Sequence, residues 1–248
     1  PLVLAGCGDF NKGFKKGYER AKKSAEERGE RNTPPPKAGA KAEPKKSEPP
    51  KVVIADAVIE KAIRERIRKP NGELTTSDLR RVDFIRLNNN GLTDVSELAK
   101  LTRLRRLLLA RNNLTDVSIL ATLTNLVELD LSQNEKIDLD TVPKLTKLKF
   151  LELRDNKLTD VSPLGDLDGL IKLNLSGNKL TDLSSLANNT NLSTLYLNNN
   201  QITEVRALTN LTRLRAVNLF DNPNLTKIEI STLRKALRKC QIFHNAKK

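Results

Sequence analysis

The sequence predicts an α/β solenoid, in which short coils stack into a curved horseshoe with a parallel β-sheet on the concave side and a short helical or irregular convex side. One apolar pattern, L-x-x-L-x-L-x-x-N-x-L, occurs seven times within residues 82–225, always 22 residues apart. A constant period between about 20 and 29 residues is typical of such solenoids. Aromatic residues make up only 3% of the chain, and Trp and Met are absent. The core must therefore consist of branched aliphatic side chains packed in a regular array.

Each repeat is predicted to contribute one short strand followed by a turn. In the second repeat, Leu104, Leu107 and Leu109 alternate along the strand and are expected to point into the core. Arg106 and Leu108 lie between them and are expected on the opposite face. The asparagine after each strand can satisfy backbone groups that the turn would leave unpaired. We interpret these asparagines as structural, not as a catalytic or metal-binding ladder; they are Asn90, Asn112, Asn134, Asn156, Asn178, Asn200 and Asn222.

This pattern is similar to that of leucine-rich repeat proteins, and the half that reads LTDVSxLAxLT resembles the repeats of bacterial internalins. The resemblance covers residues 82–225 and implies a compact, short-helical convex side. Two repeats depart from the pattern. Asn189 stands where leucine is expected, and Lys136-Ile137 shifts an apolar residue by one position in the third repeat. We expect local loosening of the convex side at both places.

The segments on either side of the repeats are predicted to be caps, because terminal coils would otherwise expose their leucines. Residues 52–81 contain a helical pattern that Pro70 stops, and its apolar face consists of Val58, Ile59, Ala62, Ile63 and Ile67. In residues 226–248, Ile230, Leu233 and Leu237 share a helical face, and a short strand is expected after them. We interpret Cys240 as a buried cap residue in preference to a reactive thiol.

The chain begins with a short apolar run, LVLAGC, which is too short to span a bilayer. A buried strand is one interpretation, although nothing after the run resembles a partner strand. Leu4-Ala5-Gly6-Cys7 resembles a bacterial lipobox, with residues 1–7 as the end of a lipoprotein signal peptide that lacks its basic start. The resemblance implies cleavage before Cys7, acylation of Cys7 and anchoring in the cell envelope. Gly8, in place of Asp after the cysteine, favours the outer over the inner membrane.

Residues 8–51 are polar and rich in Pro and Lys, which predicts a disordered tether between anchor and solenoid.

The net charge of +14 raises the question of a nucleic-acid ligand. Residues 1–51, 52–81 and 226–248 carry net charges of +6, +2 and +6, whereas residues 82–225 contain 17 basic and 17 acidic residues. A groove that follows a phosphate backbone needs Lys and Arg clustered along its binding face. We therefore predict no nucleic-acid partner.

A ligand is expected on the outward face of the predicted strands, where the core places no demand on the residue type. Four of the eight Phe and Tyr residues of the chain fall at such positions. Aromatic residues and Arg are typical of binding hot spots, and mixed charges give selectivity. The alternative is that exposed strand positions simply favour aromatic residues. The candidate ligand-binding residues are Phe84, Arg86, Arg106, Leu108, Glu128, Asp130, Phe150, Glu152, Arg154, Tyr196 and Phe220.

One pair of carboxylates raises the question of catalysis. Asp130 and Glu152 occupy one column on adjacent strands, about 5 Å apart, with Glu128 nearby. Such a pair can serve a retaining glycosidase or bind calcium. The neighbouring cations and the open sheet favour a salt-bridged surface instead. Those cations are Arg106, Arg154 and Lys172.

The sequence contains no other pattern typical of an active site. His244 is the single histidine, lies in a C-terminal tail that is expected to be frayed, and has no visible Ser, Cys or Lys partner. There is no phosphate loop and no zinc-ligand spacing. We predict a monomeric, non-enzymatic module without metal or cofactor that binds a protein or peptide on its concave face. The alternative is a passive structural or adhesive envelope lipoprotein without a specific concave ligand.

Overall fold

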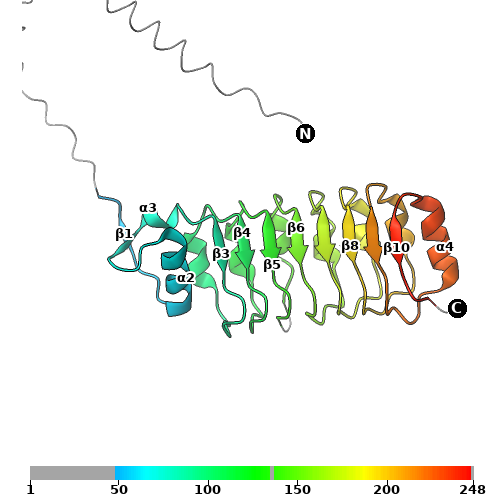
Figure 1. The fold of residues 1–248 in the computed structure, drawn as a ribbon, viewed down its shortest axis with the longest axis horizontal. Helices are drawn as coiled ribbons and strands as arrows, with labels where there is room; N and C mark the ends of the chain where they lie inside the picture. Colours follow the sequence, from blue (N-terminus) through cyan, green and yellow to red (C-terminus); the bar gives the residue numbers. More distant parts are fainter. Residues whose placement is uncertain (1–47, 135–136, 247–248) are drawn as a thin grey trace, which may run out of the picture. The chain divides into compact units, whose positions relative to one another are not determined.

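The computed structural model describes residues 48–134 and 137–246. Within this part, a parallel eight-stranded sheet has the order β10-β9-β8-β7-β6-β5-β4-β3, and a second, two-stranded sheet pairs β1 with β2. Figure 1 shows the eight strands side by side along the repeats. The predicted lipobox, Cys7, residues 8–47 of the predicted tether and Lys136 lie outside the described residues.

Each repeat contributes a strand of three residues to the large sheet. Consecutive strands from β3 to β9 pair in parallel with a constant offset of 22 residues, so that Phe84 lies opposite Arg106 and Arg106 opposite Glu128. This register confirms the predicted parallel sheet. The strands are β3 (Phe84–Arg86), β4 (Arg106–Leu108), β5 (Glu128–Asp130), β6 (Phe150–Glu152), β7 (Lys172–Asn174), β8 (Thr194–Tyr196), β9 (Ala216–Asn218) and β10 (Gln241–Phe243).

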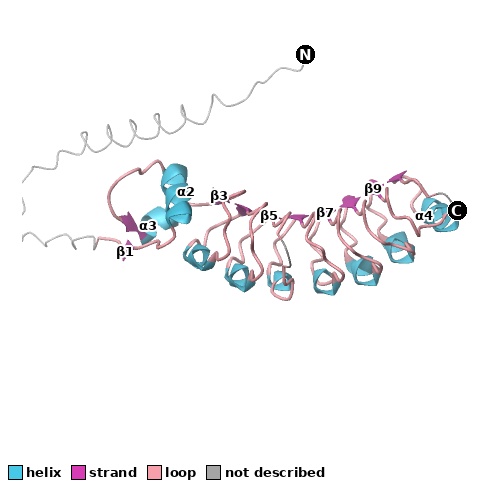
Figure 2. Cartoon of the chain, turned by 90° about the horizontal axis from the view of Figure 1, so that it is seen from below, coloured by secondary structure: helices cyan, strands magenta, loops and turns pink. Residues whose placement is uncertain are grey.

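The other side of each coil carries a short 3-10 helix. Figure 2 shows the strands along the inner curve of an arc and these helices along its outer curve. The Asp of the T-D-V-S motif starts the helical turn: Asp116 accepts a hydrogen bond from the Ser118 amide at 2.7 Å, and this bond lowers the pKa of Asp116. The helices are η1 (Ser96–Lys100), η2 (Ser118–Thr122), η3 (Val142–Lys144), η4 (Ser162–Leu164), η5 (Ser184–Asn188) and η6 (Arg206–Asn210).

A single aliphatic core runs through all coils, from Ile54 to Leu237. Leu104, Leu107 and Leu109 are fully buried, as the period of two along the strand predicts. In the described part of the chain, the buried hydrophobic residues include no Phe or Tyr. The core is thus built as the composition requires, and the rings remain available for the surface.

The repeated asparagines join each coil to the one before it. The Asn112 side chain accepts from the amides of Asn90 and Leu92 at 3.1 and 3.0 Å. Its Nδ2 donates to the carbonyls of Leu87 and Leu109 at 2.9 and 2.8 Å. Equivalent buried asparagines recur through Asn222. The amides therefore satisfy backbone groups of two coils at once.

Asn90 differs from the later asparagines because no repeat precedes it. It is exposed, and its Nδ2 donates to the Asn88 carbonyl of its own turn at 2.9 Å. The sequence pattern alone makes Asn90 look equivalent to the other six, but its environment is different.

The expected loosening of the convex side is wrong at Asn189. This residue is fully buried, and its Nδ2 donates to the carbonyls of Leu164 and Leu167 in the preceding coil at 3.1 and 3.0 Å. It therefore adds a second cross-coil connection where a leucine would only pack, although its Oδ1 is buried without a hydrogen-bond partner among the described residues. In the third repeat, Ile137 is buried despite its shifted position.

Both predicted terminal helices are present. Helix α2 (Ala57–Ile67) begins at Asp56, whose side chain accepts from the amides of Val58 and Ile59 at 2.8 and 2.9 Å. Its buried face joins the core of the first coil. The described segment before the repeats also contains β1 (Lys51–Val52), β2 (Leu74–Thr75) and the short helix α3 (Thr76–Leu79). Lys51 thus lies in a strand, whereas the predicted tether extends through it.

At the other end, α4 (Lys227–Ala236) buries Ile230 and Leu233, and Leu237 follows it into the core. The next segment returns as β10, parallel to β9. The position of these helices at the ends of the core is consistent with capping, which itself remains a prediction.

Candidate functional site

The face of the large sheet opposite the core displays the candidate binding residues. The strand register aligns equivalent positions of successive repeats into columns, with neighbouring strands about 4.8 Å apart. Every predicted binding residue is half-buried or exposed, and none lies in the core. We call this surface the sheet face. It comprises the first and third residues of strands β3 to β10 and the second residue after each strand.

The N-terminal half of the sheet face, on β3 to β7, contains charges that are paired with one another. The Arg106 guanidinium lies 2.7 Å from a Glu128 carboxylate oxygen and 4.9 Å from the centre of the Phe84 ring. The hydrogen bond with Glu128 raises the pKa of Arg106. A cation, a carboxylate and a ring from three adjacent strands thus form one cluster.

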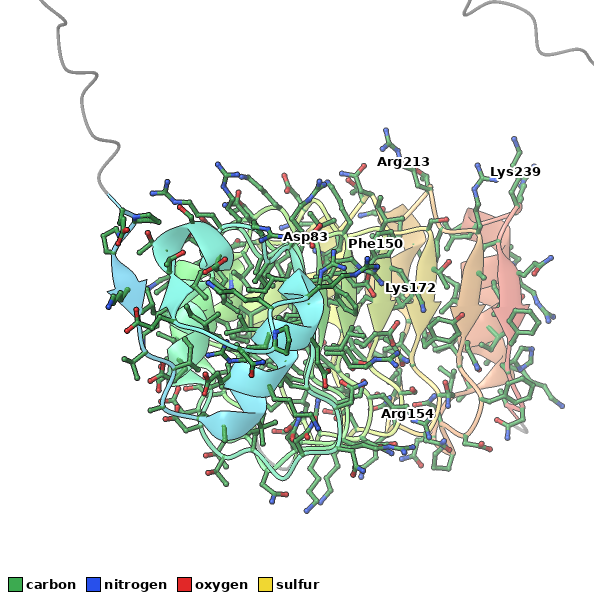
Figure 3. The ribbon with its side chains drawn as sticks, turned by 60° about the vertical axis from the view of Figure 1, so that its left-hand side comes forward. Asp83, Phe150, Arg154, Lys172, Arg213 and Lys239 are labelled. Atoms are coloured by element: carbon green, nitrogen blue, oxygen red, sulfur yellow. The ribbon has the colours of Figure 1, made fainter. Side chains whose placement is uncertain are left out.

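A second cluster surrounds Glu152. One carboxylate oxygen lies 2.7 Å from Lys172 Nζ, and the other accepts from Asn174 Nδ2 at 2.8 Å. The hydrogen bond with Glu152 raises the pKa of Lys172, whose ammonium also lies 5.4 Å from the Tyr196 ring centre. Figure 3 shows Phe150 and Lys172 on this face, where they are opposite each other in the register.

The carboxylate pair considered for catalysis is part of this paired surface. Asp130 lies opposite Glu152 on the neighbouring strand, and its Oδ1 accepts from the Ser132 amide at 2.9 Å. Both oxygens of Glu152 are already engaged. Among the described residues, no group of three or more His, Cys, Asp or Glu is placed to hold a metal ion. The geometry supports the salt-bridged interpretation.

The remaining predicted residues of this half are more separate. Phe150 is 38% exposed. Arg154 lies in the turn after β6 and pairs with the adjacent Asp155 at 2.9 Å. Leu108 is half-buried on β4, and Arg86 is exposed at the end of β3.

The C-terminal half of the sheet face, on β8 to β10, has a different composition. It contains no charged side chain at the sheet-face positions, all of which are described: Thr194, Tyr196, Asn198, Ala216, Asn218, Phe220, Gln241, Phe243 and Asn245. Phe220 and Phe243 are 41% and 46% exposed, which is more than Phe150. Phe243 and Tyr196 lie on either side of Asn218 in one column. This half is therefore a neutral surface with three rings.

Phe243 is the residue that sequence reasoning missed. A strand after α4 was expected, but not its pairing with β9, because β10 lies 25 residues after β9 instead of 22. The apolar Ile242, in register with Val217, is the available signal. Treating residues 241–243 as an eighth strand would have placed Phe243 in the same column as Tyr196.

The two potentially reactive groups near the C-terminus are held by local contacts. Cys240 is half-buried and not fully buried as predicted, and burial raises the pKa of its thiol to about 11. His244 lies in a described segment and not in a frayed tail: its Nδ1 accepts from the Ala246 amide at 3.2 Å, and its Nε2 lies 3.1 Å from the Arg234 guanidinium. Burial, followed by the charge of Arg234, lowers the pKa of His244.

Comparison with known proteins agrees with this architecture. Residues 102–144, 146–188 and 190–235, together more than half of the chain, match the family described as leucine-rich repeats (2 copies). Among curated protein sequences, none matches the chain significantly.

Among solved structures, internalin C2 of Listeria monocytogenes is similar, with a TM-score of 0.72 and 29% identity over 78% of this chain and 86% of that chain. A second L. monocytogenes internalin, inlF, gives a TM-score of 0.70 and 27% identity over 78% of this chain. The chain spans only 58% of the length of that second internalin.

The repeat architecture and these internalin-like neighbours support a protein–protein interaction module, and such folds are typically non-enzymatic scaffolds. The constant 22-residue register, the aliphatic core, the asparagines that join the coils and the family match lead to the same assignment: the chain belongs to the leucine-rich repeat proteins.

Proposed function

We propose that this protein is a membrane-tethered, non-enzymatic module that binds a protein or peptide ligand on the sheet face. The observation that carries the proposal is the neutral, ring-bearing C-terminal half, where Tyr196, Phe220 and Phe243 project from adjacent strands and turns. Aromatic side chains contribute a large contact area with few rotatable bonds, and they dominate the affinity of many interfaces.

The scaffold beneath these rings favours binding without rearrangement. Leu195 of β8 and Val217 of β9 are fully buried, and Ile242 of β10 is half-buried against the core. Asn200 and Asn222 donate to carbonyls of the preceding coils and so fix adjacent coils to each other. A surface that is already ordered loses little conformational entropy when a partner docks. The paired charges of the N-terminal half would then add selectivity more than affinity.

The proposed anchor is the acylated Cys7, in the outer membrane, with the residues after it as the spacer. The support is the lipobox resemblance of residues 4–7 and the need for more than one acyl chain to hold a protein stably at a bilayer. In the described part, no helix has the length and apolarity needed to cross a bilayer.

Crosslinking in the native envelope, followed by affinity capture, tests the binding proposal. The variant Tyr196→Ser/Phe220→Ser/Phe243→Ser should lose a specific partner while its circular dichroism spectrum and melting temperature stay unchanged. The matched control is Ile228→Ser, because Ile228 is 76% exposed on α4 and lies outside the sheet face. If the triple variant captures the same proteins as the wild type, the sheet face is not the binding surface.

The anchor is tested separately by metabolic labelling with an alkyne fatty acid. Cys7→Ala should abolish labelling and release the protein from the membrane fraction. Retention of the unlabelled variant in that fraction would contradict lipid anchoring through Cys7.

A further inference from the structure

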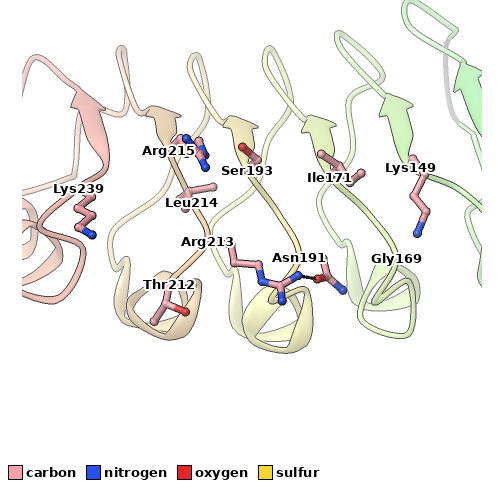
Figure 4. Close-up of a pocket in the computed structure, with 10 residues that line it drawn as sticks. All are labelled: Lys149, Gly169, Ile171, Asn191, Ser193, Thr212, Arg213, Leu214, Arg215 and Lys239. Carbon is pink, nitrogen blue, oxygen red and sulfur yellow. Dashed lines mark hydrogen bonds between the residues drawn. The ribbon is translucent and has the colours of Figure 1, made fainter. Parts of the chain in front are cut away.

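A second surface lies along the edge of the solenoid where the strands begin, which we call the strand-start edge. A groove of about 770 Å³ runs there between the ends of the 3-10 helices and the starts of the strands, as Figure 4 shows. None of its lining residues belongs to the sheet face. They are Lys149, Gly169, Ile171, Asn191, Ser193, Thr212, Arg213, Leu214, Arg215 and Lys239.

The charge of this groove is of one sign. Four cations line it and no carboxylate does. Arg213 donates to the amide oxygen of Asn191. For Lys149, Arg215 and Lys239, the described part of the chain provides no ion pair. This contrasts with the sheet face, where Arg106 and Lys172 are matched by carboxylates.

The basic character continues along the edge beyond the groove. The residues on either side of the first inward residue of each repeat include seven cations and a single acid, Asp83. These cations are Arg81, Arg103, Arg105, Lys147, Lys149, Arg213 and Arg215. At the opposite edge, one position of the repeat is acidic in six coils: Asp94, Asp116, Asp138, Asp160, Asp182 and Glu204. Figure 3 places Arg213 and Lys239 on the first edge. The zero net charge of residues 82–225 therefore conceals a basic strand-start edge, whose charge is balanced by acidic residues elsewhere in the repeats.

The floor of the groove is small and partly apolar. Gly169 lets the end of the Lys149 side chain lie close to the backbone, because a Cβ there would be 3.1 Å from Lys149 Nζ and 3.3 Å from the Leu148 carbonyl oxygen. Ile171 is 39% exposed, and Ser193 adds a short polar side chain. An apolar group seated on Ile171 would lie between the cations at the two ends.

The dimensions fit a short extended peptide. The groove runs from Lys149, just before β6, to Lys239, just before β10. Four strand spacings of about 4.8 Å give a length of roughly 19 Å, which is about six residues of extended chain. No aromatic ring lines the groove, whereas proteins that hold single-stranded nucleic acid stack the bases on such rings.

We propose that the strand-start groove binds an extended acidic peptide segment that carries an apolar side chain. The carboxylates would pair with Lys149 at one end and with Arg213, Arg215 and Lys239 at the other. The apolar side chain would rest on Ile171. This site is independent of the sheet face, so the two can hold different parts of one partner or two partners.

Fluorescence anisotropy with the full chain tests this proposal. The probe is a labelled octapeptide of six Glu and two Leu, at low salt. Lys149→Glu/Arg215→Glu should bind it roughly tenfold more weakly, since each exposed ion pair contributes a few-fold and reversal adds repulsion. The matched control is Lys179→Glu/Arg206→Glu, which changes one Lys and one Arg that are exposed and do not line the groove. The basic residues before Glu48 contribute equally to both variants.

Two further probes define the ligand. Replacing both Leu of the peptide with Ser should weaken binding several-fold, and an unchanged affinity would remove the apolar contact from the proposal. Equal weakening of the groove variant and the control would show that only general charge attraction operates, and would overturn the site. An oligothymidylate that binds more tightly than the peptide, with the same dependence on Lys149 and Arg215, would assign the groove to nucleic acid.

Sedimentation equilibrium of the full chain tests whether a second copy of the chain occupies the groove instead. A concentration-dependent dimer that Lys149→Glu/Arg215→Glu abolishes would make a second copy the occupant, and would contradict the peptide proposal. The sheet-face variant Tyr196→Ser/Phe220→Ser/Phe243→Ser should bind the octapeptide as the wild type does, so the outcome here is separate from that of the proposed function.

Discussion

The two halves of the sheet face share one scaffold and differ in what they display. On β3 to β7 several charged residues pair with neighbours within the protein, as Arg106 does with Glu128 and Lys172 with Glu152. On β8 to β10 the face has no charge, and three rings project from it. Buried aliphatic residues and joining asparagines underlie β3 to β9 in both halves, whereas β10 has only the half-buried Ile242 beneath it.

This difference indicates which half can contribute more to the free energy of binding a ligand. A partner that binds the charged half must compete with ion pairs that already exist, so the net gain is small. A partner that covers the rings of the neutral half removes apolar surface from water, at about 25 cal/mol per Å². We therefore expect the C-terminal half to supply affinity and the N-terminal half to supply selectivity.

The largest expected effect comes from removing rings on each half separately. Tyr196→Ala/Phe243→Ala should weaken binding of the captured partner by about 3 kcal/mol, as hot-spot residues do. Phe84→Ala/Phe150→Ala, the matched pair on the charged half, should cost under about 1 kcal/mol. Calorimetric titration with the purified partner measures both. Equal losses of binding free energy from the two pairs of substitutions would contradict the proposed difference between the halves.

The next prediction tests whether the asparagine hydrogen bonds contribute equally to the free energy of unfolding beneath both halves. Asn134→Ala and Asn200→Ala remove the same three kinds of hydrogen bond, so each should lower the free energy of unfolding by about 2–3 kcal/mol. Asn90→Ala should cost under about 0.5 kcal/mol, because Asn90 is exposed. Urea denaturation followed by circular dichroism provides these values. A cost at Asn200 well below that at Asn134 would mean that the C-terminal coils are held by something else.

A smaller effect is expected from the ion pair of the charged half. Lys172→Met leaves Glu152 with Asn174 and water, and should change the free energy of unfolding by less than about 1 kcal/mol because the pair is partly exposed. Binding through the C-terminal rings should change little. A loss of affinity as large as that of Tyr196→Ala/Phe243→Ala would place Lys172, and the charged half, at the centre of the interface.

The smallest effect concerns Cys240, next to the neutral half. Its raised pKa of about 11 keeps the thiol protonated at neutral pH, so alkylation by iodoacetamide in a Cys7→Ala background should be slow at pH 7.5 and faster in urea. Because the folded pKa lies above the usual value of 9.0, the contribution to stability is present below about pH 9 and falls as the pH rises toward 11. Equal alkylation rates in the folded and unfolded protein would contradict the burial of the thiol.

The sequence predicted the fold well because the repeat fixes local geometry many times over. The spacing of Leu104, Leu107 and Leu109 decides which side of the strand is buried, and the constant period decides which residues become neighbours. The same argument correctly kept Phe150 and Tyr196 out of the core. Residues inside the periodic block could thus be placed without coordinates.

Features that break the period could not be predicted in the same way. Phe243 joins the sheet through a pairing across α4, which is a tertiary contact outside the repeat. Asn189 departs from the repeat pattern, and its amide donates to two carbonyls of the preceding coil. Those carbonyls lie near Asn189 only because the coils stack, so the sequence could not predict these hydrogen bonds. The basic strand-start edge was concealed because counting charges along residues 82–225 does not separate one edge from the other. That the candidate residues contact a ligand remains a prediction.

The asparagine connections run in one direction only, since each amide reaches back to the coil that precedes it. A whole 22-residue repeat could therefore be inserted or deleted between Asn112 and Asn200 without loss of the asparagine hydrogen bonds between the coils on either side. Each such change would lengthen or shorten the molecule by about 5 Å. An insertion between β5 and β6 would leave the ion pairs Arg106–Glu128 and Glu152–Lys172 intact, because each of them joins two strands on one side of that point. It would move one ion pair away from the aromatic residues of the C-terminal half and leave the other beside them.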